Sequence, residues 1–133
     1  MRVIHIEAQS RRSTVLVGES IENLPRHLPP GRAVVITDER LMRLHRTALP
    51  PLPTVSIGCG ESVKTLDTVK SIYETLADLE VDRSTFVLGI GGGVVCDVTG
   101  FVASTYLRGL RFGYAATTLL AQVDASVGGK TGV

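Results

Sequence analysis

Residues 85–97 read TFVLGIGGGVVCD, and this stretch decides the fold. The apolar run over 85–88 predicts a buried strand, and the charge-poor run over 94–107 predicts a buried helix. Glycines 89, 91, 92 and 93 lie between them, so we interpret all four as a strand-to-helix turn. Glycine lets backbone N–H groups approach a ligand closely, and a helix N-terminus adds partial positive charge. The turn is therefore predicted to bind a phosphate or pyrophosphate; a tight turn without a ligand is the alternative. Val94 breaks the common GxGxxG fingerprint.

The segments around this turn alternate between strands and helices. Further strands are predicted over 33–37, 54–57 and 112–116. Apolar residues at steps of three and four, among them Leu66, predict a helix from about Ser62 to Glu80. Strand, helix and strand joined by short connections indicate an α/β fold with a parallel sheet.

The two ends of the chain are expected to be less regular. Residues 3–8 and 14–17 form two β-branched runs that can pair antiparallel, with the polar residues 10–13 as their connection. Near the other end, residues 119–123 form a short apolar segment.

Composition excludes several classes of protein. The 133 residues suffice for one domain, and the net charge of +1 argues against a general nucleic-acid binder. No apolar run approaches the roughly 20 residues that cross a bilayer, and we expect no signal peptide and a cytoplasmic location. Three histidines and two cysteines show no metal-ligand spacing. Ten of the 14 glycines lie at or after Gly89, so that part is where a site is expected.

Several polar residues lie near predicted strand ends. Asp38 follows the strand over 33–37, where an acidic residue can hold a ribose or cap a helix. Asp97 is expected in the first turn of the helix after the glycines, either complementing the helix dipole or contacting a ribose or substrate. In GESVKT, Glu61 precedes the next helix, and Lys64 is expected in its first turn. A cation there opposes the dipole, which favours a bound anion; an exposed surface lysine is the alternative.

The chain closes with DASVGGKTG over 124–132. It nearly matches the GxxxxGKT phosphate-binding loop, but Asp124 stands in place of the first glycine and would repel phosphates. We therefore interpret Asp124 and Lys130 as a polar pair on a glycine-rich loop, suited to hydroxyls and to an anionic or carbonyl group.

Taken in order, these motifs resemble the sugar-phosphate cyclase family, and within it the 3-dehydroquinate synthases. The resemblance spans residues 33–133. It is carried by ITD at 36–38, GESVK at 60–64, GGGVVCD at 91–97, TYLRG at 105–109, TTLL at 117–120 and QVDASVGGKTG at 122–132.

The resemblance implies a Rossmann-like, NAD-binding α/β domain over residues 1–133. Family enzymes convert 3-deoxy-D-arabino-heptulosonate 7-phosphate to 3-dehydroquinate in the shikimate pathway, with tightly bound NAD and a divalent metal, Zn or Co. Their metal ligands lie in a helical C-terminal domain, which we expect after residue 133. The chain by itself is accordingly expected to bind NAD without turnover, and no catalytic residue is assigned within it.

The family motifs also assign roles to single residues. NAD contacts are implied for Asp38, Glu61, Lys64, Gly92, Gly93, Val94, Asp97, Thr117, Thr118 and Lys130. Substrate contacts are implied for Asp124 and Lys130. Arg108 would reach the substrate phosphate of a neighbouring subunit, which implies a homodimer.

The chain departs from the family pattern at three positions: Cys96 replaces a glycine, Ala116 a proline, and Arg40 a common asparagine. Two other interpretations stay open from the residues. One is an iron-type alcohol or glycerol dehydrogenase-like domain, and the other is a nucleotide-binding module without chemistry.

Overall fold

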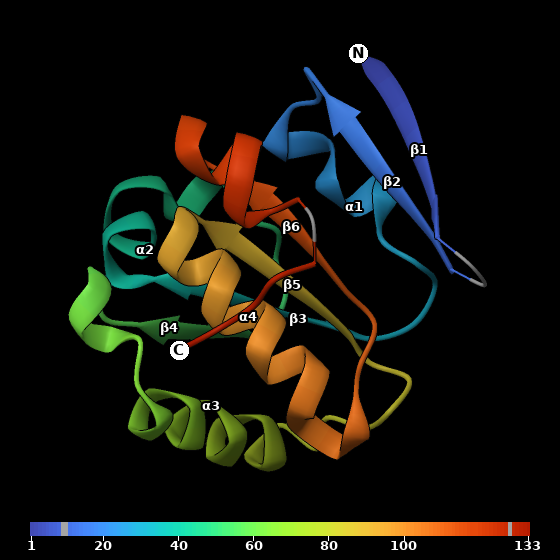
Figure 1. Ribbon diagram of the computed structural model, residues 1–133. Helices are drawn as coiled ribbons and strands as arrows, with labels where there is room; N and C mark the ends of the chain where they lie inside the picture. The colour runs from blue at the N-terminus through green and yellow to red at the C-terminus, as the bar shows by residue number, and fades with distance from the viewer. Residues whose placement is uncertain (9–10, 128) are drawn as a thin grey trace.

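A four-stranded parallel sheet forms the centre of the computed structural model, which describes residues 1–8, 11–127 and 129–133 (Figure 1). The strands lie in the order β4 (Thr54–Ile57), β3 (Ala33–Asp38), β5 (Phe86–Gly91) and β6 (Phe112–Ala116). The predicted parallel α/β fold is confirmed. Because the chain steps from β3 to β4 on one side and then to β5 on the other, the strand order reverses between β3 and β5. In parallel sheets this reversal point opens a crevice at the carboxyl ends of the strands.

Two helices of 13 residues cover one face of this sheet (Figure 1). In α3 (Leu66–Asp78), Val69, Ile72 and Leu76 are buried against the strands. Leu66 is 68% exposed, so its place in the predicted apolar stripe is wrong. The helix begins later than predicted, because the Thr65 hydroxyl caps α3 by accepting a hydrogen bond from the Thr68 N–H. Residue 66 is therefore the first helical position and lies at the exposed end of the helix.

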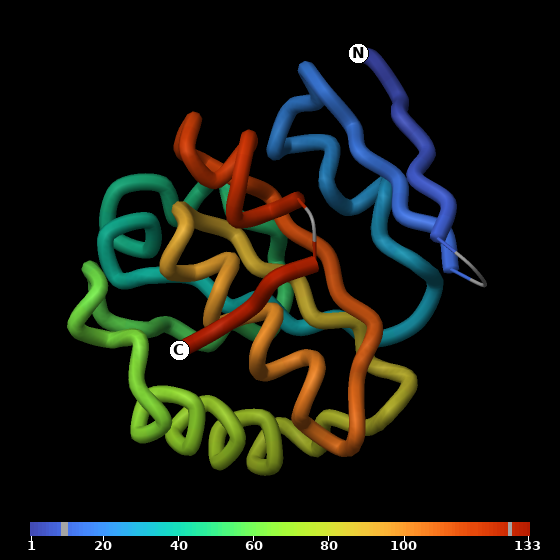
Figure 2. The backbone as a smooth tube through the Cα atoms, in the orientation of Figure 1, coloured from blue at the N-terminus to red at the C-terminus, as the bar shows by residue number. Residues whose placement is uncertain are grey.

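The second helix, α4 (Gly93–Thr105), is buried along most of its length. Val95, Val98 and Val102 join the same core as α3, while Gly100 lies against Tyr114 and Thr131. Figure 2 shows the last residues of the chain passing across α4. The small residue at position 100 therefore leaves room for this crossing.

Two of the four glycines belong to strand β5 rather than to the turn, which corrects the prediction. A Cβ at Gly89 would lie 2.7 Å from the Thr99 hydroxyl, and one at Gly91 would lie 2.6 Å from the Val95 side chain. These two glycines therefore serve the close packing of α4 on β5. Only Gly92 and Gly93 remain for the turn.

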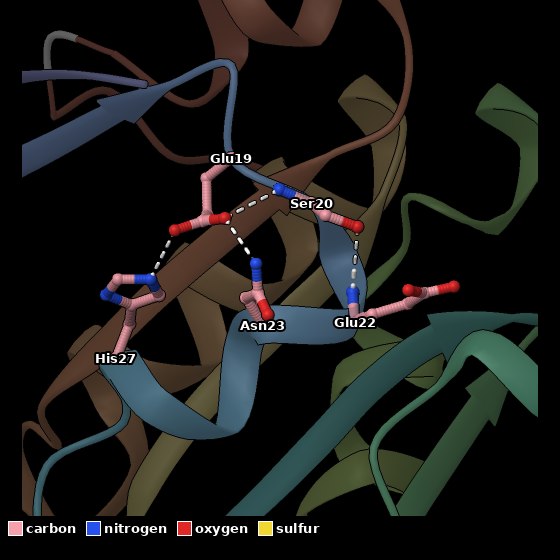
Figure 3. A network of polar contacts seen from close by, with 5 residues as sticks. All are labelled: Glu19, Ser20, Glu22, Asn23 and His27. Carbon is pink, nitrogen blue, oxygen red and sulfur yellow. Dashed lines mark hydrogen bonds and ion pairs between the residues drawn. The ribbon is translucent and has the colours of Figure 1, made fainter.

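The opposite face of the sheet is covered by η1 (Ile21–Asn23), α1 (Leu24–His27) and the segment around Leu49 and Leu52. Figure 3 shows the polar contacts that hold η1 and α1 together around Glu19. Its carboxylate accepts hydrogen bonds from the Asn23 amide at 2.8 Å and the Ser20 N–H at 2.9 Å, and it contacts His27 Nε2 at 2.7 Å. These contacts, that of Asn23 first, lower the pKa of Glu19 to about 2.

Strands β1 (Arg2–Ala8) and β2 (Arg11–Val17) pair antiparallel in a separate two-stranded sheet, as predicted. The predicted connection is too long, because residues 11–13 already belong to β2. Arg12 lies opposite Glu7, and this opposite-charge pair favours pairing where apolar patterning gives no signal. Residues 9 and 10 lie outside the described part of the chain.

The remaining elements are short. They are α2 (Glu39–His45), η2 (Arg46–Ala48), η3 (Glu61–Val63), η4 (Tyr106–Arg108) and the π-helical η5 (Ala121–Ala125). The apolar segment predicted over 119–123 thus runs into η5. Within the described residues, no helix has the length and hydropathy needed to cross a membrane.

Candidate functional site

A concave site of about 200 Å³ lies where β3, β4 and β5 end, at the reversal of the strand order. Four of the predicted cofactor residues, Asp38, Gly92, Gly93 and Val94, line it. It adjoins a more open hollow of about 550 Å³ beside α2, with which it shares Arg40 and Cys59. The fold therefore brings residues more than 50 positions apart in the sequence to one edge of the sheet.

The glycine turn provides the floor of this site. Gly92 is the N-cap residue of α4 and has no side chain with which to cap the helix. The first N–H groups of a helix have no partner within it, so those of the α4 N-terminus are directed to the site. A Cβ at Gly92 would approach the Thr118 methyl group to 3.3 Å, so a side chain there would fill the cradle. The turn thus fits a phosphate group in space and in charge.

Asp38 ends β3 and caps α2. Its Oδ1 accepts a hydrogen bond of 2.8 Å from the Leu41 N–H, and the Cys59 thiol lies 3.9 Å from the same atom. The capping role that the sequence left open is therefore present. Asp38 also lines the concave site, and among the described residues its hydrogen bonds involve Oδ1 alone, which leaves its second oxygen for a hydroxyl group.

An ion pair joins the loop after β4 to helix α4. Lys64 Nζ donates a hydrogen bond of 2.9 Å to Asp97 Oδ2 and lies 3.7 Å from Glu61 Oε2. The hydrogen bond to Asp97 is the main cause that raises the pKa of Lys64, and the two carboxylates add to it.

This geometry corrects two predictions. Lys64 precedes the N-cap Thr65, so it lies outside the first turn of α3, and its charge is compensated by Asp97 and Glu61. Asp97 is the fifth residue of α4 and lies beyond its first turn, so its partner is Lys64 rather than the dipole.

The predicted threonines follow β6 and reach the turn from the other side. The Thr117 N–H donates to the Gly91 carbonyl at 2.9 Å, and the Thr118 hydroxyl accepts from the Ala121 N–H at 3.2 Å. Thr118 also lies beside Gly92. Both threonines are exposed, so they form a rim of the turn.

The three predicted substrate residues lie outside the concave site. Asp124 belongs to η5 and Lys130 to the irregular segment after it, and both are exposed. Within the described residues these two side chains form no ion pair with each other, and their predicted contacts to substrate stay a prediction. Arg108 follows the far end of α4, and 13 helical residues separate it from Gly92 by about 20 Å. It therefore cannot join the glycine turn of its own chain.

Sequence reasoning missed four residues that line the concave site, namely Gly58, Cys59, Gly60 and Val95. The signal was present, since Gly58 and Gly60 directly follow β4, and Gly60 adopts a positive φ of 87°. Within the described residues, no group of three or more His, Cys, Asp or Glu side chains lies close enough to hold a metal ion.

A family model described as 3-dehydroquinate synthase N-terminal matches residues 54–133, which include the glycine turn, the ion pair and the threonine rim. The chain belongs to the 3-dehydroquinate synthase family. This match favours that family over the iron-type alcohol and glycerol dehydrogenases.

Relatives of the 3-dehydroquinate synthase family agree with this assignment. The 3-dehydroquinate synthase of Halorhodospira halophila is 41% identical over an alignment of 140 positions. This alignment covers the whole chain and 40% of that protein. The chain thus spans about two fifths of the length of this curated relative. Among solved structures, a 2-deoxy-scyllo-inosose synthase complexed with carbaglucose-6-phosphate, NAD+ and Co2+ matches 93% of the chain and 37% of its own, with a TM-score of 0.81 and 26% identity.

A second solved structure is the 2-epi-5-epi-valiolone synthase of Streptomyces hygroscopicus, with NAD+ and Zn2+ bound. It matches 96% of the chain and 39% of its own, with a TM-score of 0.79 and 28% identity. The central sheet and its helices are therefore the fold of the sugar-phosphate cyclases.

The structure also explains two of the three departures of this 3-dehydroquinate synthase family member. Cys96 is fully buried, and burial raises the pKa of its thiol to about 11, so it packs in the core and does not crowd the turn. Arg40 is exposed and lines both the concave site and the hollow beside it. Nothing in the structure explains Ala116.

Proposed function

We propose that this chain forms the NAD-binding part of a 3-dehydroquinate synthase. The observation that carries the proposal is the Gly92–Gly93 turn, placed at the reversal of the strand order and open toward a concave site. Dinucleotides bind at such reversal points, with the pyrophosphate on a helix N-terminus. The NAD+ named for both cyclase structures supports the choice of dinucleotide.

Different residues of the site would contact different parts of NAD. The N–H groups of Gly93 and Val94 would hold the pyrophosphate, and the free oxygen of Asp38 would accept from a ribose hydroxyl. The remaining contacts are proposed for Glu61, Lys64, Asp97, Thr117, Thr118 and Lys130. Because Lys64 and Asp97 neutralise each other at 2.9 Å, they position a hydroxyl group without placing net charge beside the phosphates.

When bound, NAD would supply a reversible hydride acceptor for a hydroxyl of the sugar phosphate 3-deoxy-D-arabino-heptulosonate 7-phosphate. Asp124 and Lys130 would then hold substrate hydroxyl and carbonyl groups. The described residues offer no ligand set for the divalent metal named for the two cyclase structures, Co2+ and Zn2+, so no metal ligand is proposed within them.

We also propose a homodimer in the cytoplasm. Arg108 supports it, because this exposed side chain lies at the opposite end of α4 from the turn. Leu107 and Arg108 both have positive φ, 49° and 67°. Residues without glycine's freedom keep such strained backbone only where surrounding structure or function requires it. A role of Arg108 toward the substrate phosphate of a partner subunit would provide that function.

Calorimetric titration of the purified chain with NAD+ tests the proposal. A Cβ at Gly93 would meet its nearest neighbour, Ala125, at 3.8 Å, so Gly93→Ala fits the fold but places a methyl group in the phosphate cradle. We expect saturable binding by the natural chain and at least tenfold weaker binding by Gly93→Ala. Gly132→Ala is the matched control, because a Cβ there has no neighbour within 4 Å. Absence of NAD+ binding by the natural chain, or equal affinity of Gly93→Ala, would contradict the proposal.

A further inference from the structure

The hollow beside α2 extends the concave site away from the glycine turn. It holds about 550 Å³, and Arg40 and Cys59 line both spaces, so one ligand can pass from one to the other. A dinucleotide with its pyrophosphate on Gly92 and Gly93 and its ribose on Asp38 would therefore direct the group at the 2′ position of that ribose toward the hollow. This step rests on the proposed function.

Two arginines face that substituent. Arg40 and Arg43 lie three residues apart on α2, which places them on one face of the helix, and both line the hollow. Neither guanidinium forms an ion pair within the part of the chain that the structure describes. Glu39 contributes the acidic side chain of the same lining, so the hollow has an excess of positive charge.

A ribose hydroxyl does not require two guanidinium groups, whereas a phosphate group does match them. Guanidinium binds phosphate through parallel N–H donors, and an arginine beside the ribose accommodates a 2′-phosphate in related folds. We propose that Arg40 and Arg43 form a subsite for the 2′-phosphate of a dinucleotide, so that the cofactor site accepts NADP+ as well as NAD+.

The test compares the dissociation constants of NADP+ and NAD+, measured by calorimetry on the full chain. For the natural chain we expect the two constants to lie within tenfold of each other. The ratio of NADP+ to NAD+ dissociation constants should rise at least tenfold in Arg40→Asn and further in the Arg40→Asn/Arg43→Asn double variant. Arg46→Asn is the charge-matched control, because Arg46 is exposed but lines neither space, and it should leave the ratio unchanged.

The possible failures are distinguishable. If NAD+ binds but the ratio changes less than threefold in the double variant, the 2′-phosphate subsite is refuted and the proposed function stands. If neither dinucleotide binds the natural chain, both proposals fail. A third measurement uses inorganic phosphate. Suppose that phosphate raises the melting temperature of the natural chain but not of Arg40→Asn, while the ratio of the NADP+ and NAD+ dissociation constants is the same in both. In that case the arginines bind the free ion, and the 2′-phosphate subsite is also refuted.

Discussion

Gly91→Ala tests whether close packing behind the site holds the glycine turn in place. A Cβ at this position would lie 2.6 Å from Cβ and Cγ2 of Val95 and 3.0 Å from its Cγ1. Carbon atoms in contact prefer about 3.5–4.0 Å, so β5 and α4 must separate by about 1 Å at this point. Overpacking of this kind costs about 1–3 kcal/mol, partly offset by about 0.5 kcal/mol from the stiffer unfolded chain.

We therefore expect Gly91→Ala to lower the free energy of unfolding by about 2 kcal/mol. For a chain of this size that corresponds to a melting temperature lower by roughly 8 °C. Urea denaturation followed by circular dichroism measures the change. Because Gly92 and Gly93 follow directly, the displacement of α4 should also weaken NAD+ binding in calorimetry.

A double-mutant cycle identifies the cause. Val95→Ala removes the Cγ1 and Cγ2 methyl groups but keeps the Cβ that would lie at 2.6 Å, so it relieves only part of the clash; by itself it costs about 2 kcal/mol. If the Val95 methyl groups cause much of the strain, Gly91→Ala costs less in the Val95→Ala background than in the natural chain, with a coupling energy of about 1 kcal/mol. Additive effects within about 0.5 kcal/mol would refute the reasoning, because the cost would then arise elsewhere.

Three further predictions concern a buried hydroxyl, a thiol and a carboxylate. Thr99 Oγ1 is buried with no hydrogen-bond partner among the described residues, so Thr99→Val should stabilise the fold by about 1 kcal/mol. Thr37→Val removes a hydrogen bond of 2.7 Å to the Ile90 carbonyl and should destabilise the fold by about the same amount. Urea denaturation measures both changes. At pH 8 a maleimide should modify exposed Cys59 and spare buried Cys96, and NAD+ should slow the reaction, as mass spectrometry would show. Glu19 has a folded pKa lowered to about 2, so its stabilising effect over Glu19→Gln is present above pH 4.5 and should disappear as the pH falls toward 2, measured as the difference in melting temperature; a constant difference would contradict this.

The sequence predicted the elements better than the uses of its glycines. Short continuous apolar runs identify β3 and β5, because a parallel strand buried on both faces lacks alternation and these runs are too short for a buried helix. The same run of glycines does not reveal that Gly89 and Gly91 face a helix while Gly92 and Gly93 line the concave site. That distinction depends on which side of β5 receives α4, and this is a property of the assembled sheet.

The ion pair between Lys64 and Asp97 was equally difficult to predict from the sequence. Lys64 and Asp97 are 33 residues apart, and each was interpreted against the dipole of its nearest helix. The fold instead places the loop after β4 beside α4, because β3 and β5 are neighbours and α3 and α4 share one face of the sheet. Local rules of helix capping apply to each residue separately and therefore could not find this ion pair.

The core positions the two halves of the candidate site unequally. Asp97 lies on α4 between buried Cys96 and buried Val98, so the packing that stabilises the fold also fixes the carboxylate beside Lys64. Asp124 lies on η5, where Ala121 is buried but the neighbouring Val123 is 69% exposed. A side chain is held in place by the contacts of the element that carries it, and η5 has far fewer of these than α4. The proposed cofactor residue Asp97 is thus positioned by this chain's own core, whereas the orientation of Asp124 depends much less on it.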